Sequence, residues 1–219
     1  MNVIDGKDGS ATHMAYITLR NMILTGALPA GKKLKIEDLR ALLATGASPV
    51  REALSLLTSD MLVERIDQRG FRAAPASIAN FDEILSLRCT LDDMALRQSI
   101  TAATSDWEDR LVLSHHRMTR AAAQDPTRFE AAHKLFHMTL LDNASSPMLA
   151  RFCSQLYDLN IRYRYLAADG PDYKKRDIPA EHESILNAVI RRDADAASAA
   201  LLNHYRRTGE YLVGKLTNL

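Results

Sequence analysis

Four of the seven histidines in this chain of 219 residues have a spacing that suits a metal site. His133 and His137 are four residues apart in a segment with helical periodicity, so their side chains project from one face of the expected helix. His182 lies near the start of a later segment, and His204 lies in the middle of the last one. If these three helices are antiparallel neighbours in a bundle, the four imidazoles can converge on one divalent cation.

Each histidine also has a simpler interpretation, as a partly buried side chain with its own hydrogen-bond partner or as a surface residue. We expect the surface alternative for the adjacent His115 and His116, which lie on a polar helix. Four imidazoles at the positions above favour the shared site, because burying several of them without partners is costly.

The elements that would carry these residues are six amphipathic segments that follow residue 77. They are expected at roughly 78–102, 105–123, 126–142, 146–168, 176–192 and 194–216. The low aromatic content, 6%, favours helices packed on helices over a sandwich of strands. The sequence therefore predicts a mainly α protein whose C-terminal part, residues 77–219, is an all-helical bundle of six to seven antiparallel helices.

The part before residue 77 has a different pattern, which predicts a winged helix-turn-helix over residues 13–76. Its three helices are expected near residues 17–24, 37–43 and 48–59, and the third is expected to start with Ser48 as its cap and Pro49 at its first position. A two-stranded hairpin, 62–66 and 71–74, forms the wing. Residues 1–12 are polar and predict a disordered tail.

A winged helix-turn-helix places its third helix in the major groove of DNA. The groove-facing end would carry Ser48, Val50, Arg51 and Ser55, and the wing tip would present Arg69 beside Gly70 to the minor groove. Residues 1–76 hold 10 Lys and Arg against 8 Asp and Glu, a local net charge of +2. Charge alone would favour an ordinary solvated surface, so the prediction of DNA binding depends on the order of the elements.

The same residues resemble the DNA-binding signature of the GntR superfamily of bacterial transcription regulators, in the FadR-like branch. The resemblance is carried by Ser48-Pro49-Val50-Arg51-Glu52-Ala53-Leu54, Leu57, Leu62-Val63 and Arg69-Gly70-Phe71. It implies an operator contact for Arg51, a wing-tip position for Gly70 and a C-terminal FCD effector domain. The chain departs from the family at Ala47, where a second arginine is common, and this implies a different base preference or more reliance on the wing and on phosphate contacts.

The resemblance also implies a ligand set for the second domain. FCD domains often bind a divalent metal through one aspartate and three histidines, and His137, His182 and His204 match the histidine positions. The aspartate position is His133, which is either a fourth nitrogen ligand that favours zinc or nickel or a change that weakens metal binding. Arg88 resembles the FCD arginine that clamps a carboxylate effector; the alternative is a pair with Asp92 four residues later.

These observations together predict a cytoplasmic, ligand-responsive transcription regulator, in this family most often a repressor, and not an enzyme. It would bind operator DNA as a homodimer and sense a small organic acid at the metal. One alternative is a hydrolytic metalloenzyme with a DNA-binding appendage, for which Glu130, Glu181 and Glu183 are available as general bases. Another is a structural dimerisation module without a ligand.

Composition and charge exclude several other classes. The formal net charge of +1 excludes a chain that is cationic throughout. The two cysteines, Cys89 and Cys153, are too few for a disulfide scaffold and fit a reducing compartment. We expect no membrane partner, because no apolar run approaches the roughly 20 residues of a membrane-spanning helix.

Overall fold

The computed structural model describes residues 10–67, 69–124, 126–167 and 177–216. The chain divides into two compact units. The first ends at Ser77 and also includes Ile161–Leu166, and the second consists of Ile78–Asn160 and the residues from Ala167 onwards. Most of the expected tail, residues 1–9, lies outside the described part of the chain.

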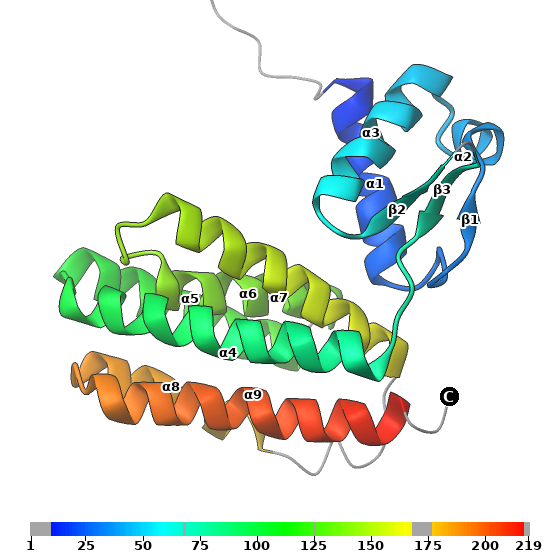
Figure 1. Cartoon of the computed structure of the whole chain (residues 1–219). Coiled ribbons are helices and arrows are strands. Elements are labelled where there is room, and N and C mark those ends of the chain that lie inside the picture. Colours follow the sequence, from blue (N-terminus) through cyan, green and yellow to red (C-terminus); the bar gives the residue numbers. More distant parts are fainter. Residues whose placement is uncertain (1–9, 68, 125, 168–176, 217–219) are drawn as a thin grey trace, which may run out of the picture. The chain divides into compact units, whose positions relative to one another are not determined.

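The first unit contains three helices and a small antiparallel sheet, which confirms the predicted winged helix-turn-helix fold (Figure 1). The helices are α1 (Ala11–Leu24), α2 (Ile36–Leu42) and α3 (Ala47–Ser59), and the strands are β1 (Lys33–Leu34), β2 (Val63–Ile66) and β3 (Gly70–Ala73). The sheet has three strands in the order β1-β3-β2, one more than the predicted hairpin. The added strand β1 is short, and its Leu34 is opposite Phe71 of β3.

Two helix starts differ from the prediction. Helix α1 begins at Ala11, because the Ser10 side chain accepts a hydrogen bond from the backbone N–H of His13 at 3.2 Å; the expected tail was therefore two residues too long. Helix α3 begins at Ala47 with Gly46 at the N-cap position. Ser48 is inside the helix and does not cap it, since its hydroxyl donates to the Glu52 carboxylate at 3.1 Å.

The core of the first unit lies between α1 and α3. Leu19 and Ile23 of α1 and Leu54 and Leu57 of α3 are buried, at spacings of three or four residues that place them on one face of each helix. The hydroxyl of Tyr16 donates to the Asp60 carboxylate at 2.7 Å and ties the two helices together at the edge of this core. This packing fixes the orientation of the opposite, exposed face of α3.

The described residues of the second unit form five whole helices and most of a sixth, α7, whose Ile161–Leu166 belong to the first unit; this confirms the predicted all-helical fold (Figure 1). They are α4 (Ile78–Thr101), α5 (Ser105–Gln124), α6 (Pro126–Leu141), α7 (Pro147–Ala167), α8 (Ile178–Ile190) and α9 (Ala194–Leu216). Helix α4 packs against α6 and α9, α5 packs against α6 and α8, and α8 packs against α9. Helices α6, α8 and α9, which carry the four selected histidines, therefore belong to one packed group.

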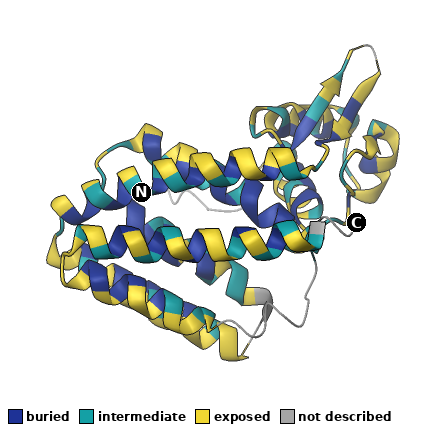
Figure 2. Cartoon of the chain, turned by 60° about the horizontal axis from the view of Figure 1, so that its bottom comes forward, coloured by how far each residue is buried: buried dark blue, intermediate teal, exposed yellow. Residues whose placement is uncertain are grey.

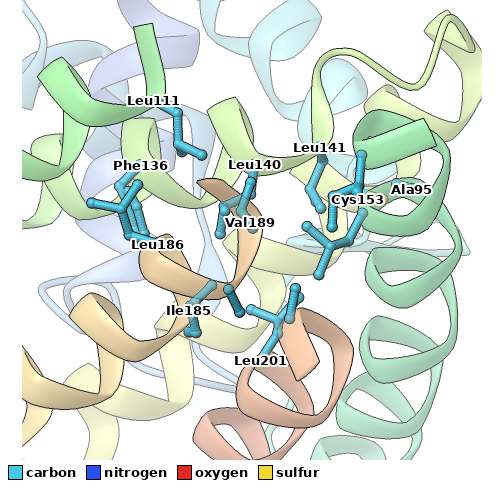
Figure 3. Packing of buried hydrophobic residues seen from close by; sticks show 14 of the residues in the cluster. Ala95, Leu111, Phe136, Leu140, Leu141, Cys153, Ile185, Leu186, Val189 and Leu201 are labelled. Atoms are coloured by element: carbon cyan, nitrogen blue, oxygen red, sulfur yellow. The ribbon is translucent and has the colours of Figure 1, made fainter. Parts of the chain in front are cut away.

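Apolar residues from these helices form a continuous core. Figure 3 shows Phe136 and Leu140 of α6 beside Ile185 and Val189 of α8, with Leu201 of α9 close by. Figure 2 shows that the helices carry a buried stripe and an exposed stripe, as expected for amphipathic helices. The four histidines lie on the buried stripe, so the same packing that forms the core also positions the polar site.

Candidate metal centre and nucleic-acid interface

The structure brings His133, His137, His182 and His204 together, as the sequence predicted. All four are buried, and one ring nitrogen from each lies within 4.8 Å of the corresponding nitrogens of the other three. The shortest separations between ring centroids are 4.5 Å, for His133 with His137 and for His182 with His204. Three helices therefore contribute to one compact group of imidazoles, which we call the four-histidine group.

The geometry of the four-histidine group fits a metal ion. Nitrogen donors at about 2.0–2.1 Å from a tetrahedral zinc ion are separated from one another by about 3.3 Å. The Nε2 atoms of His137 and His182 face each other at 3.3 Å, and the separations of up to 4.8 Å in the group require only small side-chain adjustments. The donor set also suits a late divalent ion, since all four ligands are imidazole nitrogens.

The electrostatic environment keeps His137 in the neutral form that binds metals. Burial lowers the pKa of His137 well below its usual value of 6.5, and His133, His182, Arg88 and His204 lower it further. A proton on this ring would be far from water and close to other cationic groups. The ring therefore retains a nitrogen lone pair at neutral pH, as a metal ligand must.

The Nδ1 atoms of His133, His137 and His204 contact residues outside the four-histidine group. The Nδ1 atom of His133 is 2.5 Å from the Tyr157 hydroxyl, and Nδ1 of His204 is 2.8 Å from a carboxylate oxygen of Glu181. The third contact joins Nδ1 of His137 to the Tyr205 hydroxyl at 3.3 Å. Such outer partners orient metal-binding histidines and fix which nitrogen is free.

Arg88 lies beside this group in a buried polar network. Its Nε donates to Asp92 at 3.2 Å, its Nη1 donates to the Asn160 side chain at 3.0 Å, and its guanidinium lies 4.0 Å from the centre of the Tyr205 ring. The pair with Asp92 that the sequence left as an alternative is therefore present. Nη2 of Arg88 is buried and has no hydrogen-bond partner among the described residues, so one donor of the guanidinium is uncommitted.

Asp92 connects Arg88 to the histidines. Burial raises the pKa of the Asp92 carboxyl, while the Arg88 guanidinium and a hydrogen bond from Tyr205 oppose that shift. The Tyr205 hydroxyl donates to Asp92 at 2.8 Å and also contacts His137. A continuous chain of polar contacts therefore runs from Arg88 through Asp92 and Tyr205 to the four-histidine group.

The outer face of α3 presents most of the predicted DNA-contacting residues. Ser48, Arg51 and Ser55 are exposed and lie on one face, at spacings of three and four residues. Val50 differs from the expectation, since it is fully buried. It shares the inner face of α3 with Leu54, and its side chain cannot be presented to DNA.

The wing tip carries a glycine at a position of unusual backbone conformation. Arg69 and Gly70 are exposed, and the backbone of Gly70 has a φ of +93°, a conformation that residues with a side chain rarely adopt. Arg72 on the neighbouring strand is paired with Glu64 at 2.7 Å. Residue 68, which belongs to the predicted turn, lies outside the described residues.

The sequence singled out Glu181 near the four-histidine group only as an available general base, and it did not identify Tyr157, Tyr205 or Arg207. Tyr157, Tyr205 and Glu181 contact the imidazoles, and Arg207 holds Glu181 at 2.7 Å. A weak signal was present, since Glu181 precedes one selected histidine and Tyr205 follows another. The described helices include none that is both long and apolar enough to cross a membrane.

Comparisons with known proteins agree with both halves of the fold. Residues 11–72 match the family described as bacterial regulatory proteins, gntR family, and residues 83–207 match the FCD domain. The chain is 36% identical over 202 residues to the uncharacterized HTH-type transcriptional regulator BphR of Paraburkholderia xenovorans, covering 89% of this chain and 82% of that protein. It is 26% identical over 203 residues to the HTH-type transcriptional repressor GlaR of Escherichia coli, covering 86% of this chain and 90% of that protein.

A solved structure shares the fold over almost the whole chain. The structure titled E. coli McbR/YncC superposes with a TM-score of 0.78 at 20% identity, over 94% of this chain and 99% of that one. Both family matches lie in one chain, and the second alone covers more than half of it. This chain therefore belongs to the GntR family and is a transcriptional regulator with an FCD domain.

Proposed function

We propose that this regulator binds operator DNA as a homodimer and that a divalent metal, held by the four-histidine group, forms part of a sensor for a small carboxylate. The observation that carries the sensing half is the convergence of four buried imidazoles within 4.8 Å. Among the described residues, it is the arrangement that most directly matches the requirements of a metal ion.

The DNA-binding half is supported by the exposed face of α3. Arg51 can make two parallel hydrogen bonds to a guanine edge or to a phosphate, and Ser48 and Ser55 lie one turn or less away on the same face. Arg69 and Gly70 would reach the minor groove. A homodimer would place two such units on half-sites related by a two-fold axis.

The metal would be held by His133, His137, His182 and His204, and zinc or nickel suits these donors best. When bound, it would supply a Lewis-acid centre for an oxygen of the effector. Arg88 would add a cation close to that centre. Its Nη2, which has no hydrogen-bond partner in the described part of the chain, would donate to the effector carboxylate. A small organic acid is the ligand class that suits a metal ion together with a buried guanidinium.

The hydrolytic alternative has less support. A general base must be free to accept a proton from the attacking water. The Glu181 carboxylate is instead engaged by His204 and Arg207, and Glu183 is exposed. The relatives named above are described as transcriptional regulators.

The test combines metal analysis with operator binding. Protein purified without chelator is expected to contain one divalent ion per chain, and a duplex selected from a random pool serves as the operator. Couplings between an effector and DNA are typically about 1–3 kcal/mol, so at least one acid in a panel of small carboxylates is expected to change operator affinity by about 5–150-fold. In the His182→Ala, His204→Ala double variant, metal and effector response are lost and operator binding remains.

A chain that selects no DNA sequence would refute the DNA-binding half. A chain that carries no metal and responds to no acid would refute the sensing half.

A further inference from the structure

His137 lies between two different polar neighbours, and this fixes the position of its proton. Its Nε2 faces Nε2 of His182 at 3.3 Å, and its Nδ1 faces the Tyr205 hydroxyl at 3.3 Å. The residue is fully buried, so water does not compete for either nitrogen. The location of the single ring proton therefore depends on what the Tyr205 hydroxyl does.

The Tyr205 hydroxyl has one hydrogen, and it is used on Asp92. The distance from the hydroxyl to the Asp92 carboxylate is 2.8 Å, and an ionised carboxylate only accepts hydrogen bonds. Arg88 pairs with the same carboxylate, and this cation favours the ionised form against the effect of burial. The Tyr205 oxygen can therefore only accept from His137. The ring proton must be on Nδ1, which leaves the Nε2 lone pair directed at the centre of the group.

His204 is arranged in the same way by a different partner. Its Nδ1 is 2.8 Å from Oε2 of Glu181, whose other oxygen is held by Arg207 at 2.7 Å. A carboxylate in this position accepts the Nδ1 proton, so in the neutral ring the lone pair of His204 is on Nε2. A direct carboxylate partner makes an imidazole a stronger donor to a metal than a neutral partner does.

We infer that Tyr205 and Glu181 are positioning residues for the four-histidine group: each binds the Nδ1 proton of one histidine and thereby presents Nε2 of that histidine as a metal ligand. The inference deepens the proposed function, since it assigns roles at the same site. Asp92 and Arg207 act one step further out, by fixing the hydroxyl hydrogen of Tyr205 and the orientation of Glu181.

The first measurement uses the metal-free full-length chain, so it does not depend on metal binding. Long-range proton–nitrogen NMR of protein labelled with ¹⁵N-histidine distinguishes the two tautomers of each ring. The wild type is expected to show a proton on Nδ1 of His137 and of His204. In Tyr205→Phe, His137 loses this preference and His204 keeps it; in Glu181→Met the pattern is reversed.

The second measurement is zinc affinity, determined by competition with a chromophoric chelator. Loss of an outer partner typically weakens metal affinity by about 10–100-fold, and we expect this for Tyr205→Phe and for Glu181→Met. Glu181→Gln restores most of the affinity, because its amide oxygen can still accept the Nδ1 proton. Tyr211→Phe and Glu210→Met, on α9 but outside the network, are matched controls and are expected to leave zinc affinity unchanged.

The inference is wrong if wild-type His137 or His204 carries its proton on Nε2. It is also wrong if the wild type binds zinc and both variants bind it within a factor of about two of the wild type, well below the change expected for an outer partner. A wild-type chain that binds no zinc is a different result, which overturns the proposed metal site itself. The two failures are therefore separated by the behaviour of the wild type.

Discussion

Replacing His182 and His204 together by alanine removes the α8 and α9 ligands and tests whether the four imidazoles act as one site. The remaining pair, His133 and His137, belongs to a single helix and cannot join α6 to α8 and α9. If the wild type binds zinc and free zinc is 1,000 times the dissociation constant, binding stabilises the folded state by about 4.1 kcal/mol. For a chain of this size, each kcal/mol raises the melting temperature by roughly 2–4 °C, so the expected rise is about 8–16 °C.

The assay is thermal unfolding of chelator-treated protein, followed by far-UV circular dichroism with and without zinc. The quantity compared is the rise that zinc causes in each protein, so a change in the metal-free baseline does not affect the conclusion. His116→Ala is the matched control, because His116 is exposed on α5, and it is expected to keep the full rise. The reasoning is refuted if the double variant shows the same rise as the wild type.

Three further predictions concern the DNA-binding face, the buried imidazole and helix α9. Arg51→Ala is expected to weaken operator binding by about 1–3 kcal/mol and relax base preference at one position, measured by fluorescence anisotropy on operators with single base changes. In metal-free protein, His137 binds a proton below about pH 6.5 in the unfolded state, whereas its lowered pKa opposes protonation in the folded state. The free energy of unfolding is therefore expected to fall as the pH drops below 6.5, by up to about 1.4 kcal/mol per pH unit. Urea titrations at several pH values measure this slope. Gly214→Ala is expected to stabilise the protein by about 0.5–1 kcal/mol, because its new methyl group meets open space. Gly209→Ala is expected to lose this gain, because a Cβ there would lie 2.4 Å from a methyl group of Leu85; urea denaturation of both variants measures the difference.

Each of these predictions has a result that contradicts it. For the DNA face, Arg117→Ala, an exposed arginine on α5, is the control, and an equal loss in both variants would show that Arg51 has no specific role. Stability that stays constant below pH 6.5 would show that His137 titrates normally in the folded state. Equal stabilisation by the two glycine substitutions would show that the contact with Leu85 relaxes at no cost.

The four-histidine group could be predicted because the sequence shows, from the spacing of residues within single helices, which helix face each histidine occupies. The i,i+4 spacing of His133 and His137 defines a helix face, and the helices that carry His182 and His204 were visible from their apolar pattern. The prediction that Val50 faces DNA was wrong, because it followed the position of Val50 between two predicted contacts and not the apolar spacing of the helix. It lies between two predicted contacts, Ser48 and Arg51, yet the inner stripe with Leu54 determines its orientation.

The outer network could not be predicted, because it depends on distances between helices. Asp92 and Tyr205 are more than a hundred residues apart and meet only where α4 packs on α9. The sequence showed that Asp92 could pair with Arg88, but nothing local indicated that its second partner would be a tyrosine. Strand β1 was missed because two residues are too few for an alternating pattern to emerge.

The strand order β1-β3-β2 has a consequence for how this protein behaves at high concentration. β3 is paired on both sides, so within the described sheet the unpaired backbone groups belong to the edge strands β1 and β2. β1 is two residues long, and β2 carries the charged side chains of Glu64 and Arg65. Short and charged edges are poor templates for strand addition. Winged-helix units crowded together on neighbouring DNA sites therefore have little tendency to aggregate through their sheets.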